Sequence, residues 1–304
     1  MSIDLQKVRA DTPGCENGLF FGSAGSSLMP KQVLAAQTEF LALEAHVGGY
    51  RSAQIENAKT TRCYTAIAEL LNCDSDEIAI TENATVSWNM VFHGLGLSAG
   101  DRVLTCEAEY SSNCISFVQL QNRIGIEICV VPSTESGELC TESLSALIDD
   151  RVKLIAVTHV PTNGGLVNPA AAIGKIARSA GIPFLLDACQ SVGQIDIDVE
   201  ALGCDFLSAS GRKFLRGPRG TGFLYIRRAM IEQIDPPFLD MRAATWVGPD
   251  QYKLADGATR FENWEFNYAA VIGMGVAVDY AMEIGLSPIE ARTRKLAKQM
   301  RDTL

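Results

Sequence analysis

From about residue 53 onward, stretches with apolar residues at helical spacing alternate with short apolar runs. The short runs are rich in Ile, Val, Leu and Phe, as strands buried on both faces are. This alternation predicts an α/β protein with a mainly parallel sheet. The predicted strands are Glu77–Ile80, Arg102–Thr105, Glu127–Val131, Lys153–Thr158, Phe184–Leu186, Phe206–Ser208 and Gly222–Ile226.

Helices are predicted between these runs, where apolar residues recur every three or four positions. They cover about Ile55–Leu71, Ala84–His93, Asn113–Arg123, Thr141–Ile148 and Ala170–Ala180. Residues 233–257, which include three prolines, are predicted to be irregular. Residues 288–304 have the pattern of a charged amphipathic helix, and such a helix needs a packing partner. Since none follows it, we expect either a shortened chain or a missing C-terminal domain.

Composition narrows the class of protein. A chain of 304 residues with 47% hydrophobic residues can bury a large core, which excludes a disordered protein. Its net charge of -10 and its pI of about 4.9 argue against a nucleic-acid partner, because phosphate backbones bind clustered basic surfaces. A small-molecule partner is expected instead.

Cysteine usage and the N-terminal sequence bear on the compartment. The 9 cysteines are scattered without a CxxC pair, as is typical of reduced thiols in a cytoplasmic protein. The first residues do not form a basic segment followed by an apolar one, and no stretch reaches the roughly 18 apolar residues of a membrane span. We therefore expect a cytoplasmic protein with no membrane partner, and no metal ligands are assigned.

Lys213 is the best candidate for a covalent catalyst. It follows a short strand-like run and precedes a stretch crowded with glycine and arginine, 216–222. A lysine amine whose pKa is lowered by its surroundings becomes a nucleophile, and its characteristic use is a Schiff base with a carbonyl such as that of pyridoxal phosphate. Most lysines are solvated surface residues. The local sequence is equally compatible with a surface lysine. The assignment of Lys213 therefore depends on candidate cofactor-binding residues elsewhere in the chain.

Asp187 directly follows the apolar run 182–186, at the carboxyl end of a predicted strand. Ligands of parallel α/β sheets bind at that edge. An aspartate there can pair with a protonated pyridine nitrogen and keep the ring an electron sink. Aspartate is also a common helix N-cap, and the local sequence does not choose between the two roles.

Two further strand ends carry candidate binding groups. Residues 81–85 open a helix, so Ala84 and Thr85 can hold a phosphate through main-chain amides and a hydroxyl. A capping turn without a ligand fits the same residues. Residues 109–113 follow another strand, and Tyr110 can lie over a planar cofactor ring. The alternative for Tyr110 is a half-buried tyrosine at the sheet edge.

Taken together, these segments resemble the class V aminotransferase family, the fold-type I group of pyridoxal-phosphate enzymes that includes cysteine desulfurases. The resemblance covers about residues 20–280, and the order and spacing of the motifs agree with it as well. It rests on residues 81–85, 109–113, 158–169, 187–190, 210–213 with Gly217-Pro218, and 260–262 with Asn267.

The resemblance implies a three-layer α/β/α fold with a mainly parallel sheet. It divides the chain into an N-terminal segment (1–20), a large cofactor-binding domain (21–270) and the start of a small C-terminal domain (271–304) whose remainder is absent. It also implies a homodimer, because the family's active sites lie at the subunit interface.

The same resemblance assigns roles to individual residues. Lys213 would carry pyridoxal phosphate as a Schiff base and then move the α-proton of the substrate. Asp187 would pair with the pyridine nitrogen, and Tyr110 would stack on the ring. Gln190 would reach the phenolic oxygen of the ring. Either Thr162 or Asn163 would lie nearby, because the resemblance is ambiguous by one residue at these two positions. The phosphate would be held by Ala84, Thr85, Ser210 and Arg212.

Two positions depart from the family pattern. Cysteine desulfurases have a histidine where Tyr110 stands, which weakens a desulfurase assignment. Glu265 stands where the family often has a hydroxyl residue that reaches the partner's phosphate, and a carboxylate cannot do so. The lysine loop, 212–220, most resembles the branch with ergothioneine-pathway carbon–sulfur lyases and isopenicillin-epimerase-like proteins. Cys189, beside Asp187, is expected to point away from the ring because neighbours on an extended segment alternate faces.

These implications favour a pyridoxal-phosphate lyase that acts on a small sulfur-bearing or other β-substituted amino acid. The alternatives are an aminotransferase, a cysteine desulfurase or an epimerase on the same scaffold, since the residues around the substrate choose the reaction. A catalytically incomplete protein that only binds the cofactor is a further alternative. The family's substrate-carboxylate arginine lies in a C-terminal region beyond this chain.

Overall fold

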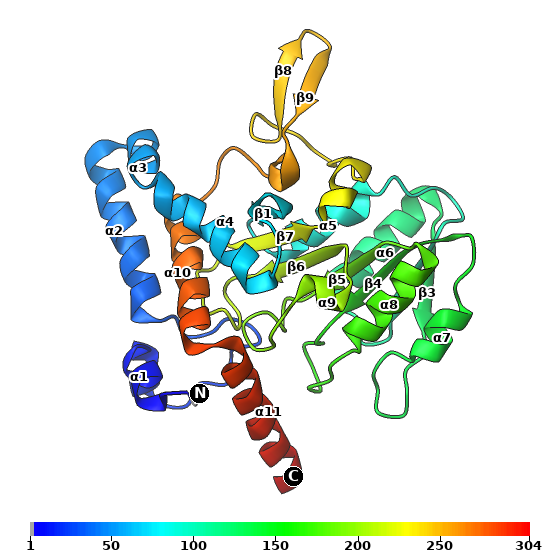
Figure 1. Ribbon diagram of the computed structural model, residues 1–304, viewed down its shortest axis with the longest axis horizontal. Coiled ribbons are helices and arrows are strands. Elements are labelled where there is room, and N and C mark those ends of the chain that lie inside the picture. The colour runs from blue at the N-terminus through cyan, green and yellow to red at the C-terminus, as the bar shows by residue number, and fades with distance from the viewer. Residues whose placement is uncertain (1–2) are drawn as a thin grey trace.

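A 7-stranded mixed sheet forms the centre of the molecule (Figure 1). The structure is a computed structural model that describes residues 3–304. The strand order is β1-β7-β6-β5-β4-β2-β3, and β7 runs antiparallel to both of its neighbours. The other adjacent pairs are parallel, so the predicted mainly parallel sheet is confirmed. The strands are β1 (Ile78–Thr81), β2 (Arg102–Cys106), β3 (Glu127–Val131), β4 (Val152–Thr158), β5 (Phe184–Asp187), β6 (Phe206–Ser210) and β7 (Gly222–Ile226).

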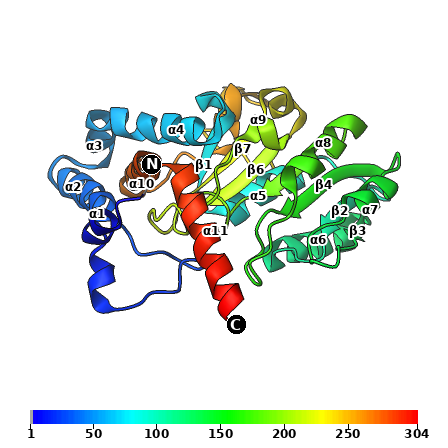
Figure 2. The same ribbon diagram turned by 60° about the horizontal axis from the view of Figure 1, so that its bottom comes forward.

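Helices cover both faces of this sheet, as the turned view shows (Figure 2). The α-helices are α1 (Leu5–Ala10), α2 (Lys31–Val47), α3 (Gly49–Ile55), α4 (Asn57–Leu71), α5 (Ala84–Gly94), α6 (Ser111–Ile124), α7 (Thr141–Ala146), α8 (Ala170–Ala180), α9 (Val199–Leu202), α10 (Tyr268–Ile284) and α11 (Leu286–Thr303). Short 3-10 helices span Pro13–Asn17, Ser75–Glu77, Arg228–Gln233 and Gly257–Phe261.

Two hydrophobic cores, one on each face of the sheet, hold the layers together. Helices α4, α8 and α10 pack on one face, and α5 and α6 pack on the other. Consecutive residues of a strand alternate between the cores: in β4, Leu154 belongs to one and Ile155 to the other. Because both faces are covered, the central strands have continuous apolar sequences. This is why the sequence pattern predicted them well.

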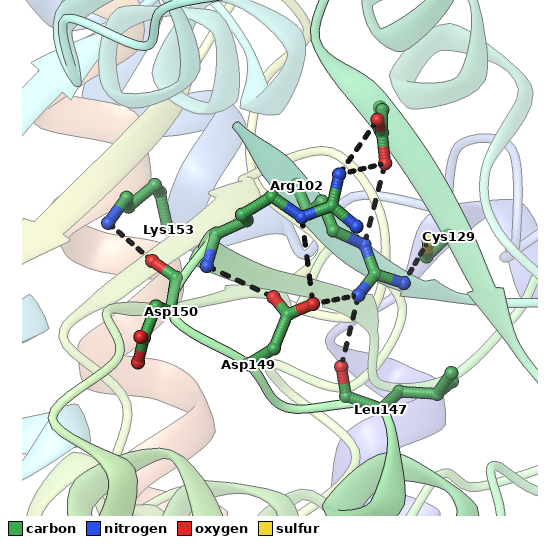
Figure 3. Close-up of polar contacts among 8 residues, drawn as sticks. Arg102, Cys129, Leu147, Asp149, Asp150 and Lys153 are labelled. Atoms are coloured by element: carbon green, nitrogen blue, oxygen red, sulfur yellow. Dashed lines mark hydrogen bonds and ion pairs between the residues drawn. The ribbon is translucent and has the colours of Figure 1, made fainter. Parts of the chain in front are cut away.

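A cluster of ion pairs ties the amino ends of β2, β3 and β4 together, at the edge where these strands begin (Figure 3). Arg102 Nη1 lies 2.8 Å from Asp149 Oδ2, and Arg151 Nη1 lies 3.0 Å from Glu127 Oε1. Arg102 Nη2 also lies 2.7 Å from Cys129 Sγ. Since exposed ion pairs contribute about 0–1 kcal/mol each, the cluster adds little to stability, and it links the starts of three strands. The opposite edge, where the parallel strands end, is left for a binding site.

The structure corrects the prediction for 233–257, which is not wholly irregular. A projecting hairpin forms there from β8 (Ala244–Gly248) and β9 (Gln251–Leu254), at the top of Figure 1. The prolines suggested a loop, but Pro249 lies in the connection between the two strands. Trp246 pairs with Tyr252, and both side chains are exposed, so the hairpin lacks the inside–outside alternation of a sheet packed on a core.

Among residues 3–304, no single helix is long and apolar enough to cross a membrane. Helices α10 and α11 meet such a criterion only when they are taken together as a pair bent by 77°. Helix α10 is largely buried, with Met274, Ala277 and Val278 fully inaccessible to solvent.

Candidate active site

A cavity of about 500 Å³ opens at the carboxyl edge of the sheet. The loops that follow β1, β2, β5 and β6 supply its walls, because parallel strands end at the same edge. Seven of the residues predicted from the sequence line it: Ala84, Thr85, Tyr110, Asp187, Ser210, Arg212 and Lys213. The fold therefore brings together side chains that are far apart in the sequence.

Lys213 is buried in this cavity, with 5% of its surface exposed. Its Nζ lies 5.6 Å from the centre of the Tyr110 ring. A buried amine facing a cavity is unusual for lysine, which is almost never fully buried unless it is paired. The solvated-surface alternative for Lys213 is therefore excluded by the fold, and its amine is available to a ligand in the cavity.

The backbone around Lys213 is held by a close-packed turn. Gly193 has a φ of +90°, and a Cβ there would lie 2.5 Å from the Leu215 nitrogen, so only glycine fits. Arg216 closes the turn by donating its N–H to the Lys213 carbonyl at 3.0 Å, and it adopts a left-handed φ of 64°. This conformation is strained for any residue except glycine.

Side-chain contacts of Arg216 offset that strain. Its Nε donates to the Leu28 carbonyl at 3.1 Å, its Nη2 donates to Thr12 Oγ1, and its guanidinium lies 5.8 Å from the Tyr280 ring centre. Arg216 thus anchors the lysine loop to the N-terminal segment and to α10.

We predict that Arg216→Ala lowers the free energy of unfolding by about 1–3 kcal/mol, because it removes these bonds and keeps the strained φ. Arg216→Gly removes the same bonds but relieves the strain, so it should be about 1 kcal/mol more stable than the alanine variant. Urea denaturation measures both values. Equal stability of the wild type and the alanine variant would show that the anchoring contacts contribute nothing.

Asp187 ends β5 and is buried beside the cavity. Its Oδ1 accepts the Cys189 N–H at 2.9 Å, and its Oδ2 accepts a hydrogen bond from Asn113 Nδ2 at 3.0 Å. Burial raises the pKa of Asp187, and the Cys189 amide, the Asn113 amide and the Lys213 charge oppose that rise. No helix begins at Asp187, so it caps a turn rather than a helix.

Helix α5 begins at the other end of the cavity. Asn83 caps it by accepting the Val86 N–H at 3.1 Å, and the Ala84 N–H donates to Ser210 Oγ at 3.0 Å. Thr85 and Arg212 line the same end. Main-chain amides at a helix start, a hydroxyl and a guanidinium form an arrangement that favours an anion.

Gln190 is buried, but it does not line the cavity. Its Nε2 donates to the Ala24 carbonyl at 3.1 Å, while its Oε1 is buried without a hydrogen-bond partner among the described residues. Thr162 and Asn163 lie in the exposed loop after β4, outside the residues that line the cavity. The structure therefore brings neither of them to Lys213, and their assignment to a phenolic oxygen stays a prediction.

The structure corrects the expectation for Cys189, which lines the cavity instead of pointing away from it. The alternation of faces ends with β5 at Asp187, and Cys189 already lies in the following turn. Asn113 and Arg219 also line the cavity and were not assigned from the sequence. Arg219 belongs to the lysine loop, whose crowding with arginine was the available signal.

The groups in the cavity fit pyridoxal phosphate. The volume lies in the range of about 300–1,000 Å³ that is typical of ligand pockets. A buried carboxylate, Asp187, faces one part of it, and the anion-binding start of α5 faces another. Tyr110 and Lys213 line the same cavity, so a ring, a phosphate and a carbonyl would each find a matching group there.

The chain is similar to known proteins over nearly its whole length. The family model described as "Aminotransferase class-V" matches residues 19–304. A relative named "Probable cysteine desulfurase" from Methanothermobacter thermautotrophicus is 32% identical over 302 residues. That alignment covers 98% of this chain and 75% of the relative.

Solved structures of related proteins have the same fold as this chain. The apo structure of a cysteine desulfurase from Thermococcus onnurineus NA1 matches with a TM-score of 0.91 and 31% identity, covering 99% of this chain and 76% of that one. The cystine C–S lyase C-DES, solved in complex with cysteine persulfide, matches with a TM-score of 0.83 and 25% identity. This match covers 90% of the present chain and 74% of the lyase chain.

Proposed function

The chain belongs to the class V aminotransferase family of pyridoxal-phosphate enzymes, and from that premise we propose that it is a lyase acting on a sulfur-bearing or other β-substituted amino acid. The observation that carries the proposal is the buried Lys213 amine, which faces the same cavity as the Asp187 carboxylate. We assign the Schiff base with the cofactor to Lys213.

Each end of the cofactor has residues suited to hold it. Asp187 would pair with the pyridine nitrogen, and Tyr110 would cover the ring. The phosphate would bind at the start of α5, and the residues around it are Ala84, Thr85, Ser210 and Arg212. When bound, pyridoxal phosphate supplies an electron sink that weakens the bonds at the substrate's α-carbon.

Lys213 would act on the substrate proton. Its Nζ would take the α-proton, and the substituent would then leave the β-carbon. General base catalysis by a positioned amine contributes about 10²–10⁴-fold to the rate. With 5% of its surface exposed, Lys213 works where water is largely excluded, which protects the proton from exchange.

Two features support a lyase over other reactions of the family. Tyr110 stands where the resemblance places a histidine in cysteine desulfurases, and the lysine loop contributes Arg212 and Arg219 to the cavity. One structural match is itself named as a cystine C–S lyase. The resemblance to the ergothioneine-pathway and isopenicillin-epimerase-like branch stays a prediction.

A cysteine desulfurase is the second candidate, because the relative at 32% identity bears that name and because Cys189 lines the cavity. Burial raises the pKa of the Cys189 thiol, and the charge of Lys213 opposes that rise. A desulfurase would transfer the substrate sulfur to a cysteine thiol of the enzyme and release alanine. A lyase would instead release pyruvate, ammonia and the sulfur species.

Product analysis separates the candidates. We predict that this chain, reconstituted with pyridoxal phosphate and incubated with cysteine, cystine and other β-substituted amino acids, releases pyruvate in equal amount to the freed substituent. Release of alanine with sulfur bound to the protein would establish the desulfurase. Loss of the bound sulfur in Cys189→Ala would identify Cys189 as the sulfur acceptor. Transfer of the amino group to a keto acid would contradict the lyase. Cofactor binding without any product would leave a catalytically incomplete binding protein.

Assembly and compartment are further parts of the proposal. We propose a homodimer, as expected from the family, and light scattering of the purified chain measures its mass. We also propose a cytoplasmic location, because the 9 cysteines are all free of disulfides in the described structure. The division at about residue 270 into a large domain and the start of a small one is retained as a proposal.

A further inference from the structure

The amide of Asn113 bridges two carboxylates beneath the cavity. Its Nδ2 lies 2.8 Å from Glu109 Oε1 and 3.0 Å from Asp187 Oδ2. Asn113 is 2% exposed and Asp187 is 4% exposed, so water does not compete for these bonds. The contact joins α6 to the end of β5 across a sequence separation of 74 residues.

The chemistry of an amide fixes its orientation here. An –NH₂ group has two hydrogens to donate, and an ionised carboxylate can only accept. With one hydrogen directed to each carboxylate, the amide cannot flip without placing its carbonyl oxygen against two negative oxygens. Asn113 therefore favours the ionised form of Asp187 and fixes one of its two oxygens.

The Glu109 carboxylate fixes the Asn113 amide in turn, because it also accepts hydrogen bonds from several other donors. Glu109 Oε2 accepts the Thr158 N–H at 3.1 Å and the Thr105 hydroxyl at 3.1 Å, at the ends of β4 and β2. Glu109 Oε1 accepts the Tyr110 N–H at 2.8 Å and a bond from Thr158 Oγ1. One carboxylate thus fixes the backbone of Tyr110 and the amide of Asn113.

We propose that Glu109 and Asn113 are positioning residues that hold the Asp187 carboxylate ionised and aimed into the cavity, where it keeps the cofactor's pyridine nitrogen protonated. The inference rests on the proposed function, because it concerns the same cofactor. Neither residue is assigned a reacting atom: Glu109 acts through Asn113, and Asn113 acts through Asp187.

Electrostatics support this geometry. Burial raises the pKa of Asp187 and of Glu109, and in each case the hydrogen bond from Asn113 opposes the rise. The charge of Asp187 also raises the pKa of Glu109. A nearby like charge disfavours the ionised form of a carboxylate and a donated hydrogen bond favours it, and Asn113 donates to both carboxylates.

Cofactor labelled at its ring nitrogen tests the proposal by NMR. In the wild type, the nitrogen resonance should have the position of a protonated pyridine. Asn113→Leu keeps the side-chain shape but removes the donor, so the resonance should move to the unprotonated position and the cofactor Kd should rise about tenfold. Glu109→Gln should move the resonance in the same direction even though it removes a negative charge near Asp187, because its amide nitrogen would face a backbone N–H and release Asn113 from its fixed orientation.

The matched control is Ser116→Ala, one turn further along α6. Ser116 is buried and its hydroxyl bonds Asn89 Oδ1 at 2.8 Å, so its loss should lower stability without moving the nitrogen resonance. If Asn113→Leu does not fold, Asn113→Ser, which keeps one donor, should give an intermediate resonance. If the folded variants at positions 109 and 113 give the wild-type resonance, the role proposed for Glu109 and Asn113 is wrong, while the proposed function stands. Failure of the wild type to bind the cofactor would overturn the proposed function together with it.

Discussion

Lys213→Ala is expected to abolish covalent cofactor binding and to lower turnover by about 10³-fold or more, because the variant loses both the nucleophile and the proton carrier. The substitution removes a buried side chain that faces the cavity, so the fold should be retained. Absorbance spectra and steady-state kinetics measure the two effects. The visible band of the bound cofactor should shift to that of the free aldehyde.

Two further variants make this result specific. Lys213→Arg keeps the positive charge but has no nucleophilic amine, so it should be as inactive as the alanine variant. Lys175→Ala, on the exposed face of α8, removes a lysine outside the cavity and should behave like the wild type. Wild-type spectra and turnover in Lys213→Ala would assign the covalent role to another residue.

Asp187→Asn is expected to have the second-largest effect. Removing one partner of a buried charge pair costs about 2–5 kcal/mol, which is roughly 30-fold or more in cofactor affinity. Turnover should fall as well, since an unprotonated pyridine is a weaker electron sink. Equilibrium titration of the chain with pyridoxal phosphate measures the affinity, and single-turnover kinetics measure the rate.

The stability of the cofactor-free chain should change much less than its affinity for the cofactor. Burial raises the pKa of Asp187, so ionisation of this group destabilises the folded chain progressively as the pH rises from the unfolded pKa through the folded pKa. Asp187→Asn removes that charge, but its amide nitrogen then faces the Cys189 N–H or the Asn113 amide, so the stability of the cofactor-free chain should stay within about 2 kcal/mol of the wild type at neutral pH. The matched control is Asp205→Asn, another carboxyl whose pKa burial raises, at the opposite edge of the sheet. A similar loss of cofactor affinity in both variants would contradict a specific role for Asp187.

Most of the central sheet could be predicted from the sequence because its strands are buried on both faces. The strand Gly222–Ile226, buried at every position, has the predicted bounds, and so does the edge strand Glu127–Val131, which is only partly buried. Residues that directly follow a buried strand could also be placed, since parallel strands end at one edge. Asp187 and Tyr110 were found on this ground, and they line the cavity with Lys213.

Features that depend on distant contacts could not be predicted in this way. The hydrogen bond between Asn113 and Asp187 joins two motifs that the sequence keeps apart. Cys189 reaches the cavity because the backbone turns after β5, and the rule of alternating faces does not describe a turn. The hairpin β8–β9 is exposed, so burial leaves no periodic trace of it in the sequence.

Reduction of the cofactor complex tests the central claim most directly. Borohydride converts a Schiff base between a lysine amine and the cofactor aldehyde into a stable secondary amine, and peptide mass spectrometry then identifies the lysine that carries it. We predict a pyridoxyl group on Lys213 and on no other lysine of the chain. A label on a different lysine, or no label after incubation with excess pyridoxal phosphate, would contradict the assignment of Lys213.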